Sequence, residues 1–159
     1  MGKPDSYISY GPQWAEAGTA AFRDHKTYTR EGGVLAPMVI AGQGVDQGTS
    51  TGAFATLLDI APTIFEWAGT AYPSTFDSHK VYPLKGKPLV DFLADTSGSI
   101  HDSTYVFAIE HSGSMLIRKG DWKLVNDGYP IEEERFELYN RLSRVNDWKH
   151  QGLREVPIP

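Results

Sequence analysis

The sequence predicts an α+β arrangement, with helices in the first part of the chain and a small antiparallel sheet after residue 97. Two patterns lead to this prediction. Between residues 53 and 68, apolar residues recur at the spacing of one helical face. After residue 97, short apolar runs alternate with Gly-containing turns, which is typical of consecutive hairpins.

Prolines divide the first part of the chain. Pro37 disfavours a fully hydrogen-bonded central position for the apolar run 34–41. Pro62 is unfavourable inside a long helix, so the stripe at 53–68 is better explained by a short helical turn followed by a second helix with Asp59 as N-cap. The expected elements are a helix at 13–22, a loop at 26–33, a strand at 34–41, helical structure at 53–68, a loop at 70–87 and a helix at 88–94.

The second part of the chain reads as a meander of strands. The turns at 111–113 and 120–121 contain glycine and separate runs of alternating apolar and polar residues. Strands are expected at 105–110, 114–119, 122–125 and 136–139.

Composition limits the classes of function. The 159 residues carry a net charge of -5, which argues against a nucleic-acid partner. No apolar run reaches the about 18 residues of a membrane span, so no membrane partner is expected. The chain contains no cysteine, which removes disulfides, thiolate metal sites and a thiol nucleophile. The N-terminus lacks the apolar core of a signal peptide, and this leaves both a periplasmic and a cytoplasmic location in bacteria open.

Four segments of the sequence follow one another in a recognisable order. They are residues 10–15 with Lys26 and Glu31-Gly32-Gly33, residues 53–63 continuing to Gly69, residues 86–89, and residues 117–125 followed by 136–139. Together they resemble the C-terminal portion of the sulfatase family, in the arylsulfatase-like branch of the alkaline phosphatase superfamily. The resemblance implies an α/β fold for the complete protein. Residues 1–96 would then form the C-terminal end of its α/β core, and 97–159 a small antiparallel subdomain.

The resemblance also implies a chemistry. Sulfatases of this type hydrolyse sulfate monoesters with a formylglycine made from Cys or Ser in a Cys/Ser-x-Pro-Ser/Ala-Arg motif. A calcium-type divalent cation, held by Asp and Asn side chains, supports the reaction. This chain contains no such motif. The family's Asp-Asn metal pair is expected just before Met1, and no metal ligands are expected within the chain. We therefore expect no turnover from the chain alone.

One catalytic residue is expected to carry over from the resemblance. Lys26 matches the family lysine that contacts the substrate sulfate, where an ammonium group offsets charge as the ester bond breaks. His25 is a second substrate-binding candidate because it adjoins Lys26. On position alone, a solvated loop side chain is the commoner interpretation of each, and for Lys26 the resemblance reverses this for the complete enzyme.

Three hypotheses follow. In the first, the chain is the C-terminal portion of an aryl or carbohydrate sulfatase, which binds its sulfate ester only in the complete enzyme. Surfaces left by the missing part could then associate two copies into a homodimer. In the second, the chain is a free-standing module that binds an anionic ligand or a protein. In the third, the parent is a related phosphodiesterase or phosphonate hydrolase. We favour the first; the natural substrate is not decided by the sequence.

Overall fold

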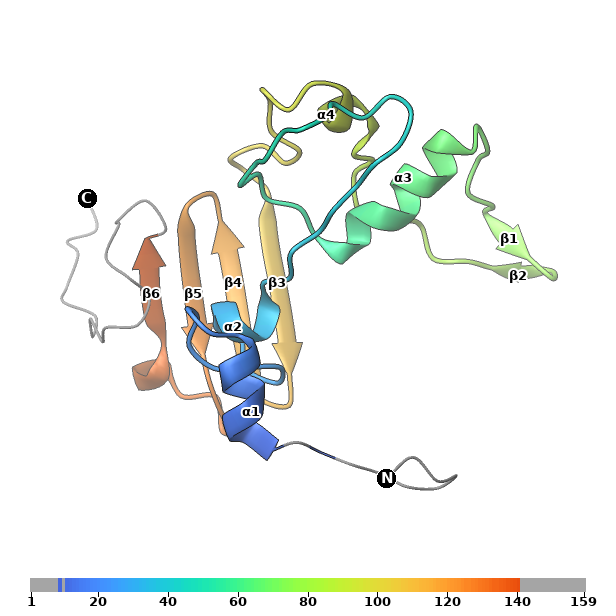
Figure 1. Cartoon of the computed structure of the whole chain (residues 1–159). Coiled ribbons are helices and arrows are strands. Elements are labelled where there is room, and N and C mark those ends of the chain that lie inside the picture. The colour runs from blue at the N-terminus through green and yellow to red at the C-terminus, as the bar shows by residue number, and fades with distance from the viewer. Residues whose placement is uncertain (1–8, 10, 141–159) are drawn as a thin grey trace, which may run out of the picture. The chain divides into compact units, whose positions relative to one another are not determined.

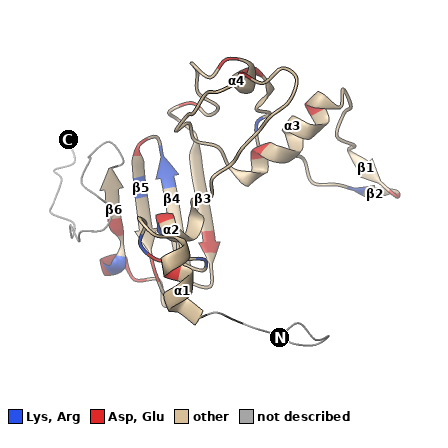
Figure 2. Ribbon diagram, viewed as in Figure 1, with Lys and Arg blue, Asp and Glu red and all other residues tan. Residues whose placement is uncertain are grey.

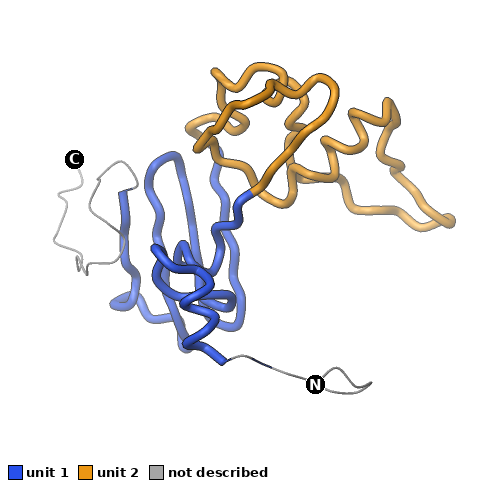
Figure 3. Tube along the Cα trace, in the orientation of Figure 1, with its two compact units in different colours: residues 1–37, 105–159 blue, residues 38–104 orange. Residues whose placement is uncertain are grey.

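The computed structural model describes residue 9 and residues 11–140. The described residues group into two compact units (Figure 3). One unit combines the residues up to 37 with those from 105 onward, and the other comprises residues 38–104. The expected boundary near residue 96 concerns the domains of a longer protein and stays a prediction.

The first unit contains a four-stranded antiparallel sheet in the order β3-β4-β5-β6 (Figure 1). Its strands are β3 (Val106–His111), β4 (Ser114–Lys119), β5 (Trp122–Asn126) and β6 (Glu137–Asn140). All four strands predicted from the sequence are confirmed within one or two residues. Ser112 and Gly113, at φ 51° and 84°, form the tight turn between β3 and β4, which suits the right-handed twist of a hairpin.

One face of this sheet is buried. Leu116 on β4 and Val125 on β5 lie directly opposite each other in the register, and their side chains are 3% and 1% exposed. Opposed residues share a face, so Glu137 and Tyr139 of β6, which pair with Val125 and Lys123, lie on this same face. Figure 1 shows the helices α1 (Gly11–Gly18) and α2 (Glu31–Val34) in front of the sheet. The segment around α2 therefore meets both apolar and charged side chains.

The second unit is built around α3 (Ile60–Trp67), which follows the 3-10 turn η1 (Leu57–Asp59). The predicted break before Pro62 is therefore confirmed, with Pro62 in the first turn, where its missing N–H costs no helical bond. Gly69 ends the helix at φ 60°, and the N–H groups of Gly69 and Thr70 bond the carbonyls of Glu66 and Phe65.

The remaining elements of the second unit are short. They are the hairpin of β1 (Thr75–Phe76) and β2 (His79–Lys80), within the expected loop 70–87, and α4 (Val90–Ala94), within the expected helix 88–94. Leu89, just before α4, is 1% exposed, and its N–H donates to Thr63 Oγ1 at 2.9 Å. This bond joins the start of α4 to α3.

The structure differs from the sequence prediction at residues 34–41. Val34 ends the single turn of α2, and residues 35–41 form no ladder with any other segment in the described ranges. Leu35, the residue after α2, has an extended backbone at φ -84° and ψ 122°. Pro37 removes one donor from this segment, and Val39 is 93% exposed.

Charged residues are spread along the chain (Figure 2). The sequence has 20 acidic and 15 basic residues. Within the part of the chain that the structure describes, no helix has the length and apolar character needed to cross a membrane.

Candidate functional site

Both site residues predicted from the sequence, His25 and Lys26, lie in the connection between α1 and α2. The Lys26 side chain is exposed, and His25 is half-buried. The His25 ring meets Tyr28 edge-on, with ring centroids 5.3 Å apart, and the Tyr28 N–H donates to the His25 carbonyl at 3.1 Å. These two contacts close a turn around Lys26, and we call residues 24–28 the Lys26 loop.

Two glycines allow this loop to pack directly on α2. A Cβ on Gly32 would lie 2.0 Å from the Asp24 carbonyl oxygen, and one on Gly33 would lie 2.1 Å from that of Tyr28. No side chain can occupy such space, because real Cβ contacts are not this short. The Gly32-Gly33 pair is therefore required by close backbone approach, and it fixes the path of the loop over the first turn of α2.

The backbone of the loop departs from ordinary conformations. Asp24 has φ 67°, which Asp adopts at modest cost, but Thr27 has φ 104°. A β-branched residue in this region is strained, by about 1–3 kcal/mol. Such strain persists only where surrounding contacts hold the backbone in place, and the strained residue here, Thr27, directly follows Lys26.

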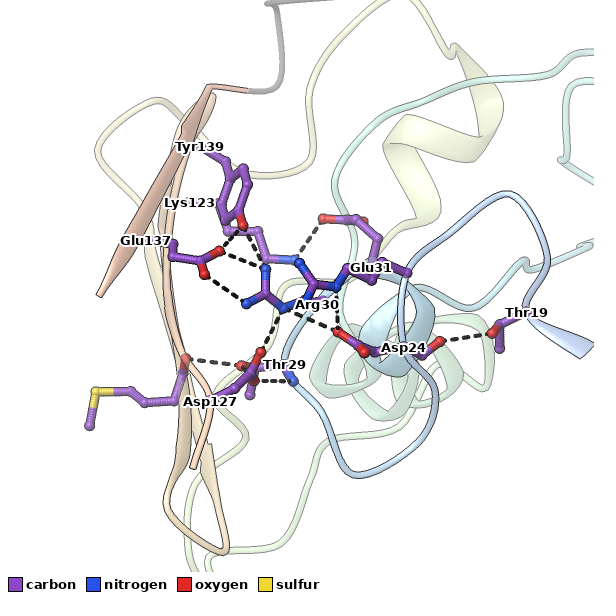
Figure 4. Close-up of polar contacts among 11 residues, drawn as sticks. Thr19, Asp24, Thr29, Arg30, Glu31, Lys123, Asp127, Glu137 and Tyr139 are labelled. Carbon is purple, nitrogen blue, oxygen red and sulfur yellow. Dashed lines mark hydrogen bonds and ion pairs between the residues drawn. The ribbon is translucent and has the colours of Figure 1, made fainter. Parts of the chain in front are cut away.

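The residues that follow the loop bind the sheet through polar contacts (Figure 4). Thr29 Oγ1 lies 3.1 Å from the Met115 carbonyl oxygen of β4 and 2.9 Å from Asp127 Oδ1, so its single hydrogen is shared between two acceptors. Thr29 is 2% exposed, and its N–H also reaches Asp127 Oδ1, at 3.3 Å. This residue joins segments 98 positions apart in the sequence.

Arg30 makes the largest set of contacts. Its Nη1 and Nη2 donate to the two carboxylate oxygens of Glu137 at 2.7 and 3.0 Å, a bidentate arrangement. Its Nε lies 2.7 Å from Asp127 Oδ2 and 3.1 Å from Asp24 Oδ2, so one guanidinium faces three carboxylates. Nη1 also donates to the Tyr139 hydroxyl at 2.6 Å. The Arg30 side chain is 12% exposed, which keeps these interactions from being fully screened.

The electrostatics of this cluster follow from those contacts. The hydrogen bond from Arg30 lowers the pKa of Glu137 to about 2, against the opposing effect of burial. Burial and the hydrogen bond to Glu137 together raise the pKa of Tyr139 to about 12. The hydrogen bond to Glu137 also raises the pKa of Arg30 above its ordinary value. At neutral pH Arg30 and Glu137 are therefore charged, while the Tyr139 hydroxyl keeps its proton.

A second ion pair lies beside the first. Glu31, the first residue of α2, accepts a hydrogen bond from Lys123 Nζ at 2.7 Å, and the Lys123 side chain is 6% exposed. The acidic residue also suits the first turn of a helix. Three consecutive residues thus bind the sheet. Thr29 binds β4 and Asp127, which follows β5; Arg30 binds Asp127 and β6; and Glu31 binds β5.

The second unit holds a separate buried polar cluster around Asp59. Its Oδ2 accepts from His101 Nε2 at 3.0 Å and from the Thr56 N–H at 2.6 Å, and its Oδ1 accepts from the Lys87 N–H at 2.8 Å. Burial opposes the charge, but the bonds from His101, Lys87 and Thr56 outweigh it and lower the pKa of Asp59. Asp59 therefore stands at the predicted N-cap position of α3, but its side chain bonds residues outside that helix.

Within the described ranges, no group of three or more His, Asp and Glu side chains is arranged to hold a metal ion. His79 and His101 both belong to the second unit, where they have separate partners: the Asp77 carbonyl for His79 and the Asp59 carboxylate for His101.

Comparison with known proteins places the chain in a family. It is 33% identical to an uncharacterized sulfatase of Schizosaccharomyces pombe over 143 residues, which are 87% of this chain and 26% of that protein. It is 32% identical to an arylsulfatase of Klebsiella aerogenes over 91 residues, 56% of this chain and 20% of that protein. The chain belongs to the sulfatase family.

Further relatives agree with this assignment. The sulfatase chain is 22% identical to arylsulfatase K of Rattus norvegicus over 121 residues, 72% of this chain and 21% of that protein. It spans about a quarter of the length of the curated relatives it matches. No family model matches it.

The structure brings His25 and Lys26 of the sulfatase chain into one loop but leaves their roles as predictions. Sequence reasoning missed Arg30, Glu137 and Tyr139, because the pairing depends on contacts across more than 100 residues. The only local signal was an Arg immediately before Glu31-Gly32-Gly33. It also missed His101, whose partner Asp59 was interpreted as a helix cap.

Proposed function

We propose that this chain supplies the sulfate-contacting lysine, Lys26, of a sulfatase that hydrolyses sulfate monoesters of aryl or carbohydrate alcohols. The observation that carries the proposal is that Lys26 projects from a loop whose backbone is held on both sides. Asp24 and Tyr28 pack on Gly32 and Gly33, while the Lys26 ammonium is left exposed. A charged group on a fixed backbone is what electrostatic stabilisation of a transferring group requires.

The chemistry proposed for Lys26 is charge neutralisation. Sulfate monoester hydrolysis builds negative charge on the leaving oxygen and the non-bridging sulfate oxygens. An ammonium group within hydrogen-bond distance of those oxygens lowers the energy of that state more than the energy of the bound ester. His25, adjacent in the loop, is proposed as a second donor to the sulfate.

We propose that the nucleophile and the metal ion are supplied by a longer protein that contains this chain. A formylglycine and a calcium-type divalent cation are proposed there, because the sulfatase resemblance implies both. The described residues form no cation site by themselves, and this chain has no Cys and no Ser-x-Pro-x-Arg motif. We therefore propose that the isolated chain does not turn over sulfate esters.

The test begins with the coding DNA upstream of Met1. An in-frame continuation that encodes an Asp-Asn pair and a Cys/Ser-x-Pro-Ser/Ala-Arg motif is expected. The protein expressed with that continuation should hydrolyse 4-nitrophenyl sulfate. A stop codon immediately upstream would instead favour a free-standing module, to be tested by titrating this chain with sulfate and sulfated sugars.

The role of Lys26 is tested in the longer protein. Lys26→Ala should lower kcat/KM for 4-nitrophenyl sulfate by about 100-fold or more, as removal of one donor to a developing anion does elsewhere. The matched control is Lys119→Ala, an exposed lysine at the end of β4 in the same unit, which should leave the rate unchanged. Faster hydrolysis of a phosphate diester or phosphonate than of the sulfate would reassign the enzyme to that class.

A further inference from the structure

Arg30 contacts both the Lys26 loop, at Asp24, and strand β6, at Glu137 (Figure 4). Its Nε lies 3.1 Å from Oδ2 of Asp24, the first residue of the loop, and its Nη1 and Nη2 donate hydrogen bonds to the two carboxylate oxygens of Glu137. The guanidinium therefore connects the loop to the sheet through a single planar group.

We propose that Arg30 is a positioning residue, which sets the location of the Lys26 ammonium by fixing the loop to the sheet through Asp24 and Glu137. This inference rests on the proposed function of Lys26. It adds that the geometry of the sulfate contact is determined by a side chain that does not touch the substrate.

The geometry requires arginine at this position. Only a planar guanidinium can bond both Glu137 oxygens while its Nε faces Asp24 and Asp127. A lysine ammonium in this position would keep the charge but lose the bidentate bond. Arg30→Lys should therefore hold the loop on the sheet better than Arg30→Gln does, but less well than arginine.

Electrostatic attraction adds to the hydrogen bonds of this connection. Asp24, Asp127 and Glu137 all face the one guanidinium, and their side chains are 21%, 16% and 34% exposed. Arg23 Nε also lies 3.7 Å from Asp24 Oδ2, but its side chain is 38% exposed. Without Arg30 the three carboxylates would therefore repel one another across a partly buried space, with only this more exposed cation to offset their charge. Asp24 is the member on the loop, so the repulsion would displace the loop rather than the paired strands.

Displacement of Asp24 would reach Lys26 directly. Only one residue separates them, and the backbone between Asp24 and Tyr28 is already constrained by the close approach to Gly32 and Gly33. The strained φ of Thr27 indicates that the loop is held against its own preference. If Asp24 were released from Arg30, the backbone of the loop would be expected to shift so that Thr27 reaches a less strained φ.

The first arm of the test measures the loop in this chain by amide hydrogen exchange. Asp24→Asn removes the charge on the loop side and leaves Arg30 bound to β6. We expect the amides of residues 25–28 to exchange at least about tenfold faster, and those of β4 to be unchanged. Arg30→Gln should give a larger acceleration. Arg135→Gln, whose partner is the exposed Glu132 at 2.7 Å, is the matched control and should change nothing in the loop. Unchanged exchange at 25–28 in Asp24→Asn would overturn the proposal.

The second arm uses the longer sulfatase and a double-mutant cycle. Asp24→Asn should lower kcat/KM for 4-nitrophenyl sulfate by about tenfold, and the same change in a Lys26→Ala background should have no further effect. Equal losses in the two backgrounds would mean that Asp24 and Arg30 only stabilise the fold, and would overturn the proposal. If Lys26→Ala alone leaves the rate intact, the proposed function fails whatever the exchange data show.

Discussion

Asp59 and His101 lie 42 residues apart in the sequence, yet Asp59 Oδ2 and His101 Nε2 are 3.0 Å apart. Both side chains are almost completely buried, at 0% and 2% exposure. An ionised carboxylate only accepts, so Nε2 of His101 carries the proton of this bond. The pair links η1 to the segment that follows α4.

Loss of this pair should destabilise the second unit. Asp59→Ala would remove the carboxylate that accepts from His101 Nε2 and from the N–H groups of Thr56 and Lys87, so we expect a loss of about 3 kcal/mol or more in the free energy of unfolding. Urea denaturation measures this loss. Asp77→Asn, in the exposed turn of the β1–β2 hairpin, should change the midpoint little. A loss of similar size in both variants would contradict the assignment.

Acid should unfold the protein through Glu137. The pKa of Glu137 is about 2 in the folded protein, below its ordinary value of 4.5. A depressed pKa contributes stability that is present above pH 4.5 and is lost as the pH falls towards 2. Stability measured by urea denaturation should therefore decline across this window, and Glu137→Gln should make the decline shallower. An identical pH profile in Glu137→Gln would exclude this group as a cause of the acid sensitivity.

Gly33 should tolerate no side chain. In Gly33→Ala the new Cβ would lie 2.1 Å from the Tyr28 carbonyl oxygen, so we expect a loss of about 3 kcal/mol or failure to fold. Gly18→Ala is the matched control, since no atom lies within 4 Å of its Cβ position at the end of α1. That change should be neutral or stabilising by up to about 1 kcal/mol. Equal thermal stability of the two variants would rule out the close approach of the loop to α2.

Tyr139 should ionise later than an ordinary tyrosine. Burial and the hydrogen bond to Glu137 raise its pKa to about 12. The absorbance at 295 nm of a protein with 8 tyrosines should therefore include a component that titrates near pH 12. Tyr139→Phe should remove that component. If the component persists in Tyr139→Phe, it belongs to another tyrosine.

Thr27→Gly should relieve backbone strain. Glycine adopts φ near 104° without steric cost, so we expect a gain of about 1 kcal/mol, reduced by the greater freedom of glycine in the unfolded chain. Thermal denaturation measures the gain. A loss of stability would mean that the Thr27 side chain contributes contacts that outweigh its strain.

Much of the fold could be predicted from the sequence because its signals are local. The strands β3 to β5 follow from alternating residues and glycine turns. The helix α3 follows from the apolar stripe at residues 53–68, which Pro62 divides. The segment 34–41 was predicted as a strand from the same kind of signal. A strand also needs a partner, and no described segment supplies one.

In the candidate site, too, residues with a local sequence signal could be predicted, and residues whose role depends on distant partners could not. Lys26 and His25 are candidates because they adjoin a motif that can be recognised in the sequence, and their roles stay predictions. Arg30 was not, since its role depends on Glu137 and Tyr139, more than 100 residues away. Single charged residues carry no pattern by which such pairing could be recognised.

The order of synthesis makes the pairing of Arg30 with Glu137 a late event. A ribosome that has completed Arg30 must add 107 further residues before Glu137 exists, which takes roughly 5–20 s at typical rates. Arg30 lacks its partner on β6 throughout that interval, whereas the partners of Asp59, namely Thr56, Lys87 and His101, are complete once residue 101 is added. A chain that terminates between residues 128 and 136 would therefore keep the Asp59–His101 pair and lack the Arg30–Glu137 pair that we propose positions Lys26.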